Sequence, residues 1–167
     1  AGYDGTSFSS AQDGTEDPND GDGHGTHVAG TAIGTGGNSN NVGVAPGSYL
    51  VDIKVLTDAG GTNNQASANG LQWMINNVDT DWGNNESSEG IQVASMSFGS
   101  FNAIDSEDPG DDGNSTNARL VNQATEAGIV CVVAIGNNGA KQVPSPASAD
   151  SALVVGAIND KNSILFL

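Results

Sequence analysis

A histidine between two glycines is the residue of this chain whose setting best suits chemistry. His24 lies in the sequence Asp22-Gly-His-Gly-Thr-His-Val-Ala-Gly-Thr31. Because neither neighbour carries a side chain, another backbone can approach this histidine closely. An imidazole titrates near neutral pH, so an accessible one can act as a general base. The chain contains 2 histidines, and both lie in this motif, which makes a glycine-rich turn with incidental histidines a poor explanation.

A metal site is the alternative reading of the same residues. His24 and His27 are three positions apart, and Asp20 and Asp22 precede them. However, the helix of zinc proteases carries its histidines four positions apart with a glutamate between them, and that pattern is absent here. We therefore expect His27 to pack beneath the helix as a hydrogen-bonded core residue, while a metallohydrolase that uses both histidines remains an alternative.

The apolar periodicity of the chain predicts alternating strands and helices. The first 23 residues are mostly polar and predict a surface loop. The nearly continuous apolar run over 129–135 is typical of a strand buried on both faces. The predicted helices cover 24–33, 65–78 and 115–127, and the predicted strands cover 49–56, 91–98, 129–135 and 152–158.

This order implies right-handed crossovers and an α/β domain with a mostly parallel sheet and helices on both faces. In such sheets, binding and catalytic residues gather where the strands end. Two polar motifs follow predicted strands, Ser97-Phe-Gly-Ser100 and Gly136-Asn-Asn-Gly139. Both motifs are therefore candidates for a functional site.

The composition excludes two classes of partner. The chain has 20 acidic and 4 basic residues, a formal net charge of −16, so nucleic acid and anionic membrane surfaces would be repelled. We interpret the charge as adaptation to salt or plain solubility, with calcium binding by acidic loops such as 105–112 as the alternative. No apolar run is long enough for a membrane helix. The single cysteine, Cys131, lies in an apolar run and is expected in the core.

The motifs together resemble the subtilisin-like serine proteases. The histidine motif is followed, in the order of that family, by further matching segments that cover most of the chain. The matching segments are Gly23–Thr31, Gly43–Pro46 with Leu50–Leu56, Ala94–Ser100, Val132–Gly139 and Pro146–Ala157. The resemblance implies a three-layer α/β fold with a mostly parallel sheet.

The resemblance also implies a role for each motif. His24 would be the general base that takes the proton of a serine nucleophile, and Asn137 would be the side-chain donor of the oxyanion hole. Ile135 is larger than the residue that is common at this place in the family, which leaves the side-chain preference open. The residues implied to bind an extended polypeptide substrate are Ser97, Phe98, Gly99, Ala134 and Gly136.

Two parts of the family pattern are missing from this sequence. No aspartate before His24 has the apolar setting of the family's catalytic aspartate, and no serine after Asn137 lies in a Gly-Thr-Ser-Met-like turn. We therefore expect residues 1–167 to be a partial peptidase domain that is inactive alone, cut from a protein that hydrolyses peptide bonds through an acyl-enzyme. The alternatives are a catalytically inactive peptide-binding relative and a non-enzymatic acidic domain that binds calcium.

The resemblance further implies a secreted or cell-surface protein. It implies no cofactor for the chemistry and leaves structural calcium and the metal ligands unspecified. The oligomeric state is equally unspecified by the sequence.

Overall fold

A computed structural model describes most of the chain as two compact units, residues 1–70 and 71–167. The described residues are 2–4 (backbone only), 18–37, 41–61, 63–83, 90–100, 110–137 and 142–158. Each unit is described below by itself. No helix in this part of the chain is long and apolar enough to cross a membrane.

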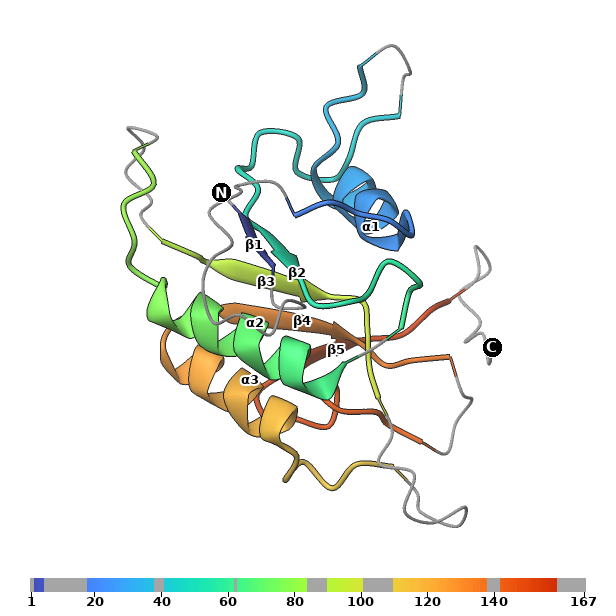
Figure 1. Ribbon diagram of the computed structural model, residues 1–167, viewed down its shortest axis with the longest axis vertical. Helices are drawn as coiled ribbons and strands as arrows, with labels where there is room; N and C mark the ends of the chain where they lie inside the picture. The colour runs from blue at the N-terminus through green and yellow to red at the C-terminus, as the bar shows by residue number, and fades with distance from the viewer. Residues whose placement is uncertain are drawn as a thin grey trace. The chain divides into compact units, whose positions relative to one another are not determined.

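The first unit contains a pair of parallel strands and a helix (Figure 1). Strand β1 (Gly2–Asp4) pairs with β2 (Asp52–Lys54), and Tyr3 lies opposite Ile53. Helix α1 covers His24–Ile33, and α2 (Asn64–Asn76) begins in this unit and ends in the second. The prediction of a loop over the first 23 residues is therefore wrong at β1. A segment of three residues with one apolar side chain is too short to show the alternation of apolar and polar residues that indicates a strand. β1 forms because β2 supplies the partners for its backbone hydrogen bonds.

Helix α1 has the predicted bounds, 24–33, and ends at Gly34. The Gly34 N–H donates to the Gly30 carbonyl at 3.0 Å, and the Gly43 N–H donates to the Gly34 carbonyl at 2.7 Å. A Cβ at Gly34 would lie 2.5 Å from the Gly30 oxygen, and a Cβ at Gly43 would lie 2.5 Å from the Gly34 nitrogen. Both positions therefore need glycine, since the returning chain passes directly against the end of the helix.

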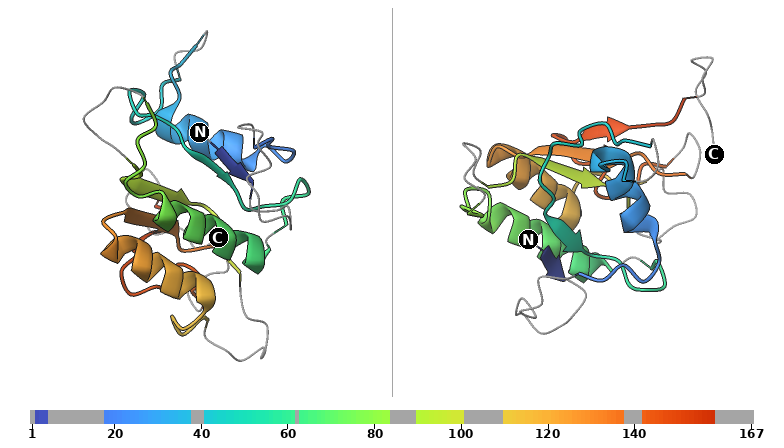
Figure 2. Two further views of the ribbon diagram at one scale, coloured as in Figure 1. Left: turned by 60° about the vertical axis from the view of Figure 1, so that its left-hand side comes forward. Right: turned by 90° about the horizontal axis from the view of Figure 1, so that it is seen from above.

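The second unit contains a parallel sheet with the strand order β3-β4-β5. The strands are β3 (Val93–Met96), β4 (Val130–Ala134) and β5 (Leu153–Val155). Helix α3 (Thr116–Glu126) and the last part of α2 lie on one side of this sheet (Figure 2). The predicted α/β class with a parallel sheet is confirmed.

Helix α3 begins and ends within one residue of the predicted range 115–127, with Ser115 and Ala127 as its caps. The Ser115 hydroxyl accepts a hydrogen bond from the Ala118 N–H at 3.3 Å, which satisfies one of the free donors of the first turn. After the helix, Gly128 adopts a left-handed φ of 100°, a conformation that costs glycine little. The chain then enters β4.

One face of the sheet is buried and the other is not, so the prediction that β4 is buried on both faces is wrong. Cys131 and Val133 are 1% and 0% exposed, whereas Val130, the first residue of the same strand, is 52% exposed. Successive side chains of a strand point to opposite faces, and α3 and the last part of α2 cover one of them. A continuous apolar run is compatible with burial of both faces of a strand, but it does not reveal which other elements pack against each face.

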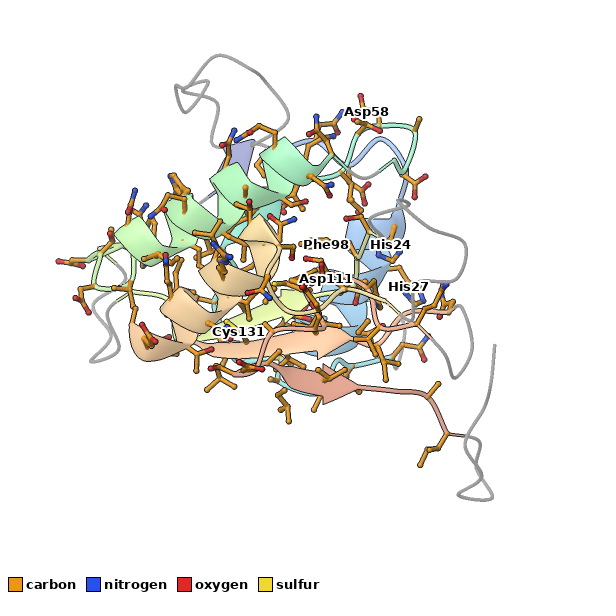
Figure 3. All side chains as sticks on the ribbon, turned by 90° about the horizontal axis from the view of Figure 1, so that it is seen from below. His24, His27, Asp58, Phe98, Asp111 and Cys131 are labelled. Carbon is orange, nitrogen blue, oxygen red and sulfur yellow. The ribbon has the colours of Figure 1, made fainter. Side chains whose placement is uncertain are left out.

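Cys131 belongs to the core, as predicted. Its Sγ lies 3.9 Å from the Val121 carbonyl oxygen of α3, and Figure 3 shows the side chain between β4 and the helix layer. Burial raises the pKa of the thiol, so Cys131 stays protonated near neutral pH and acts as a small apolar residue.

Candidate functional site

His24 is the first residue of α1 and is exposed. Gly23 precedes it with a left-handed φ of 95°, a backbone conformation that other residues adopt only with strain. The His27 N–H donates to the Gly23 carbonyl at 3.0 Å and closes the first helical turn. The local sequence therefore places the His24 imidazole at the start of a helix, beside a turn that requires glycine.

His27 lies on the same helix and is also exposed (Figure 3). The prediction that it packs beneath the helix as a core residue is wrong in this structure, because α1 has no buried residue. The spacing of Val28, Ala29 and Ile33 predicts the helix correctly, but these side chains alone do not bury its inner side.

The Asp20 carboxylate holds the turn on both sides of His24. Its Oδ1 accepts hydrogen bonds from the N–H groups of Asp22 at 3.1 Å and Gly23 at 2.8 Å. Its Oδ2 accepts from the Thr26 hydroxyl at 2.6 Å and the Thr26 N–H at 2.7 Å. These bonds, the Thr26 hydroxyl first among them, hold the pKa of Asp20 far below its usual range. Asp20 is therefore ionised at neutral pH, and its hydrogen bonds fix the backbone on both sides of His24.

Sequence reasoning considered Asp20 only as a metal ligand and missed this role. The available signal was an aspartate four residues before the histidine and a threonine two residues after it. A Cβ at Gly25 would lie 3.6 Å from Asp20 Oδ2, so the carboxylate passes close to the backbone beside His24. Among the residues that the structure describes, no group of three or more His, Cys, Asp and Glu side chains is arranged to hold a metal ion.

A second turn of the same unit packs against the residues before His24. Lys54 Nζ donates to the Asn19 carbonyl and to the Asp58 carboxylate, which is also its ion-pair partner. A Cβ at Gly60, whose φ is 73°, would lie 2.8 Å from Asp22 Oδ1. The sequence predicts a strand over 49–56 and assigns no role to the glycine-rich turn that follows it, whereas in the structure this turn packs against the histidine turn.

Replacing Asp20 by asparagine is expected to loosen the turn around His24. An amide keeps one acceptor oxygen, but its NH₂ group cannot accept from Thr26. Amide exchange over residues 20–27 of the full-length protein should therefore become faster, as measured by hydrogen–deuterium exchange mass spectrometry. The matched control is Asp22→Asn, which removes the same charge two residues away. Equal exchange in the two variants would contradict the role of Asp20.

The second half of the candidate site lies in the second unit, where two neighbouring strands end. Segment 97–100 follows β3 and segment 135–137 follows β4. Since β3 and β4 pair in parallel with Met96 opposite Val133, both segments leave the sheet at the same edge, as predicted. Of the predicted site residues, Ser97, Phe98, Gly99 and Ala134 are half-buried, and Gly136 and Asn137 are exposed.

A third segment, 142–149, lies against the first of these, and the sequence motifs include only its last residues, from Pro146 onward. Ser100 and Ser145 form an antiparallel bridge, with N–H···O distances of 2.9 and 3.0 Å. Ser145 Oγ lies 2.5 Å from Ser115 Oγ, which donates to Asp111 Oδ2 at 3.1 Å. The Ser148 hydroxyl donates to the same carboxylate oxygen. The cap of α3 and the edge of the candidate site therefore share one hydrogen-bond network.

His24 belongs to the first unit and Asn137 to the second, so the two halves of the candidate site are positioned by different units. Asn138, Gly139 and the acidic residues 105–109 lie outside the described residues.

Comparison with known proteins agrees with the motifs and the fold. The sequence model of the Subtilase family of peptidases matches residues 3–166. The chain is 38% identical over 144 residues to alkaline elastase YaB of Bacillus sp. (strain YaB), a match that covers 86% of this chain and 32% of the relative. It is 35% identical over 159 residues to subtilisin Savinase of Lederbergia lenta, with 95% of this chain and 50% of the relative covered.

A solved structure shows the same fold. The Prenylagaramide maturation protease PagA superposes with a TM-score of 0.65 at 21% identity, over 86% of this chain and 45% of that protein. The chain thus spans between a third and a half of the length of the proteins that it matches. The family match covers nearly every residue of the chain, and the chain belongs to the subtilase family of serine peptidases.

Proposed function

We propose that this chain is part of the catalytic domain of a serine endopeptidase in which His24 is the general base. The observation that carries the proposal is the position of His24 at the start of α1, exposed and bracketed by the Asp20 hydrogen bonds. A general base must reach the proton that it removes and must be held in one geometry. The glycines on both sides of His24 leave room for a nucleophile and a substrate backbone.

In the proposed reaction, His24 takes the proton of a serine hydroxyl as its oxygen attacks the scissile carbonyl. It then gives that proton to the amine that leaves, which produces an acyl-enzyme; water reverses these steps and releases the acid. The serine and the aspartate that orients the imidazole would be supplied by parts of the full-length protein outside this sequence. The catalytic chemistry needs no cofactor, and calcium would have a structural role only.

Asn137 is proposed to stabilise the negative charge that develops on the carbonyl oxygen. The residue is exposed, and Gly136 before it adopts a left-handed φ of 93°. This turn takes the chain out of β4 at the edge where segment 97–100 also leaves the sheet. A preorganised amide donor at such a place gains more from an oxyanion than from a neutral carbonyl.

The substrate is proposed to be a polypeptide in an extended conformation. A peptide that lies along Ser97, Phe98 and Gly99 can pair with their backbone as an added strand. Ala134 and Gly136 would flank it on the side of β4. The family relation to alkaline proteases and the net charge of −16 support a secreted enzyme that works in salt.

The test is proteolysis of an unstructured protein by the full-length protein and by the 167-residue chain. We expect cleavage by the full-length protein that a serine-directed phosphonate blocks, and no cleavage above background by the chain, which lacks a serine in the required turn. Phosphonate-sensitive cleavage by the chain alone would contradict the assignment. A full-length protein that binds peptides without cleaving them would be an inactive relative.

A further inference from the structure

Two glycines of the proposed substrate-binding segments face the same proline ring. A Cβ at Gly99 would lie 2.9 Å from Pro144 Cγ and 3.0 Å from Pro144 Cβ. A Cβ at Gly136 would lie 3.2 Å from the same Cγ and 3.4 Å from Pro144 Cδ. Pro144 itself is buried. The ring therefore occupies the space between the segment that follows β3 and the segment that follows β4.

The backbone on both sides of the proline is fixed. On one side, the Asp111 N–H donates to the Val143 carbonyl at 2.9 Å. On the other side, Ser145 exchanges both backbone hydrogen bonds with Ser100, at 2.9 and 3.0 Å. A movement of Pro144 would break these bonds, and leaving such groups without partners is costly.

The side chain beyond the proline is fixed as well. Ser145 is 5% exposed, and its hydroxyl lies 2.5 Å from that of Ser115, which in turn donates to Asp111. A buried hydroxyl that loses its partner destabilises the protein. The ring of Pro144 is therefore a rigid part of this edge of the sheet.

In the proposed binding mode, a substrate that pairs with segment 97–99 and presents its carbonyl to Asn137 crosses the space between the two segments. The side chain of the residue that carries that carbonyl would then enter this space. Because the Pro144 ring already fills it, a long or aromatic side chain has no room there. The ring also offers no charge or hydrogen-bonding group to a charged side chain.

We infer that Pro144 is a specificity-determining residue that restricts the substrate residue on the acyl side of the cleaved bond to small uncharged side chains, such as those of alanine and serine. This inference rests on the proposed function, since it takes the roles of Asn137 and segment 97–99 from it. Ile135, the large residue in the same motif, does not share this role. Its Cγ2 lies 3.6 Å from a Cβ placed on Gly156, which follows β5, so its side chain extends toward β5.

The test uses the full-length protein and peptide nitroanilides that differ only in the residue before the cleaved bond. Each methylene that a pocket must accept or reject changes kcat/KM by about 10–200-fold. We therefore expect the wild-type protein to prefer alanine over phenylalanine by about 100-fold or more. Pro144→Gly should raise kcat/KM for the phenylalanine substrate by about 10–200-fold and change the value for alanine little.

Ile135→Ala is the matched control and should leave the ratio of the two substrates unchanged. Titration of active sites with a fluorophosphonate corrects each variant for protein that has not folded. A wild-type protein that cleaves the phenylalanine peptide as well as the alanine peptide would overturn the inference while the proposed function stands. A ratio that changes in Ile135→Ala and not in Pro144→Gly would also overturn it. Absence of turnover and of fluorophosphonate labelling would overturn the proposed function itself.

Discussion

Replacing His24 by alanine in the full-length protein is expected to lower kcat by roughly 10⁶-fold, the magnitude known for removal of the catalytic histidine in subtilisin itself. Without the imidazole, the serine hydroxyl keeps its proton and the leaving amine receives none, so both halves of the reaction lose their proton carrier. The fold should survive, since His24 is exposed. Steady-state kinetics and thermal unfolding of the same samples would measure both effects.

His27→Ala provides the control for this experiment. The two histidines share one helix and are both exposed, but only His24 lies between the groups that Asp20 binds. We expect His27→Ala to retain kcat when rates are divided by the concentration of titrated active sites. A loss of kcat in His27→Ala that equals the loss in His24→Ala would show that the roles have been assigned wrongly.

Replacing Asn137 by leucine is expected to lower kcat by about 10²–10³ with KM nearly unchanged, a magnitude that again comes from subtilisin. In the tetrahedral intermediate, the former carbonyl oxygen carries a negative charge and moves toward its donors. An amide placed for that position contributes more in the transition state than in the bound ground state. Separate measurement of kcat and KM therefore distinguishes a role in the transition state from a role in substrate binding.

Asn138→Leu tests the position of the motif, because a shift by one residue would exchange the two outcomes. The same pair of variants separates catalysis from structure. If Asn137 merely stabilised its turn, Asn137→Leu would lower the melting temperature and preserve kcat per folded molecule. That result would refute the proposed role in the oxyanion hole.

The local signals of the sequence predict much of the fold because they act over short distances. Glycine after Ile33 ends α1, Ser115 caps α3, and the apolar run around Cys131 forms β4. These features depend on backbone freedom, a single hydrogen bond and the burial of neighbouring side chains. Each can be recognised within a few residues.

Features that depend on distant parts of the chain could not be predicted in the same way. Strand β1 exists because β2, about fifty residues later, pairs with it. The open face of β4 and the exposure of His27 depend on what packs against each element, which periodicity does not reveal.

The candidate site also contains both kinds of feature, those set by neighbouring residues and those set by distant parts of the chain. The motifs place His24 at a helix start and Asn137 after a strand, and both positions follow from neighbouring residues. The Asp20 network brings together residues that are close in sequence but have no regular spacing. The position of Pro144 between Gly99 and Gly136 joins three segments, so only the folded chain reveals it.

Labelling of the full-length protein with a fluorophosphonate tests the central claim most directly. The reagent reacts with a serine hydroxyl only where a base activates it, so we expect one labelled serine in the wild-type protein and none in His24→Ala. Peptide mapping by mass spectrometry should place the label outside residues 1–167. Labelling that persists in His24→Ala, or peptide hydrolysis that resists the reagent and stops with a chelator, would contradict the assignment of His24 as the base of a serine peptidase.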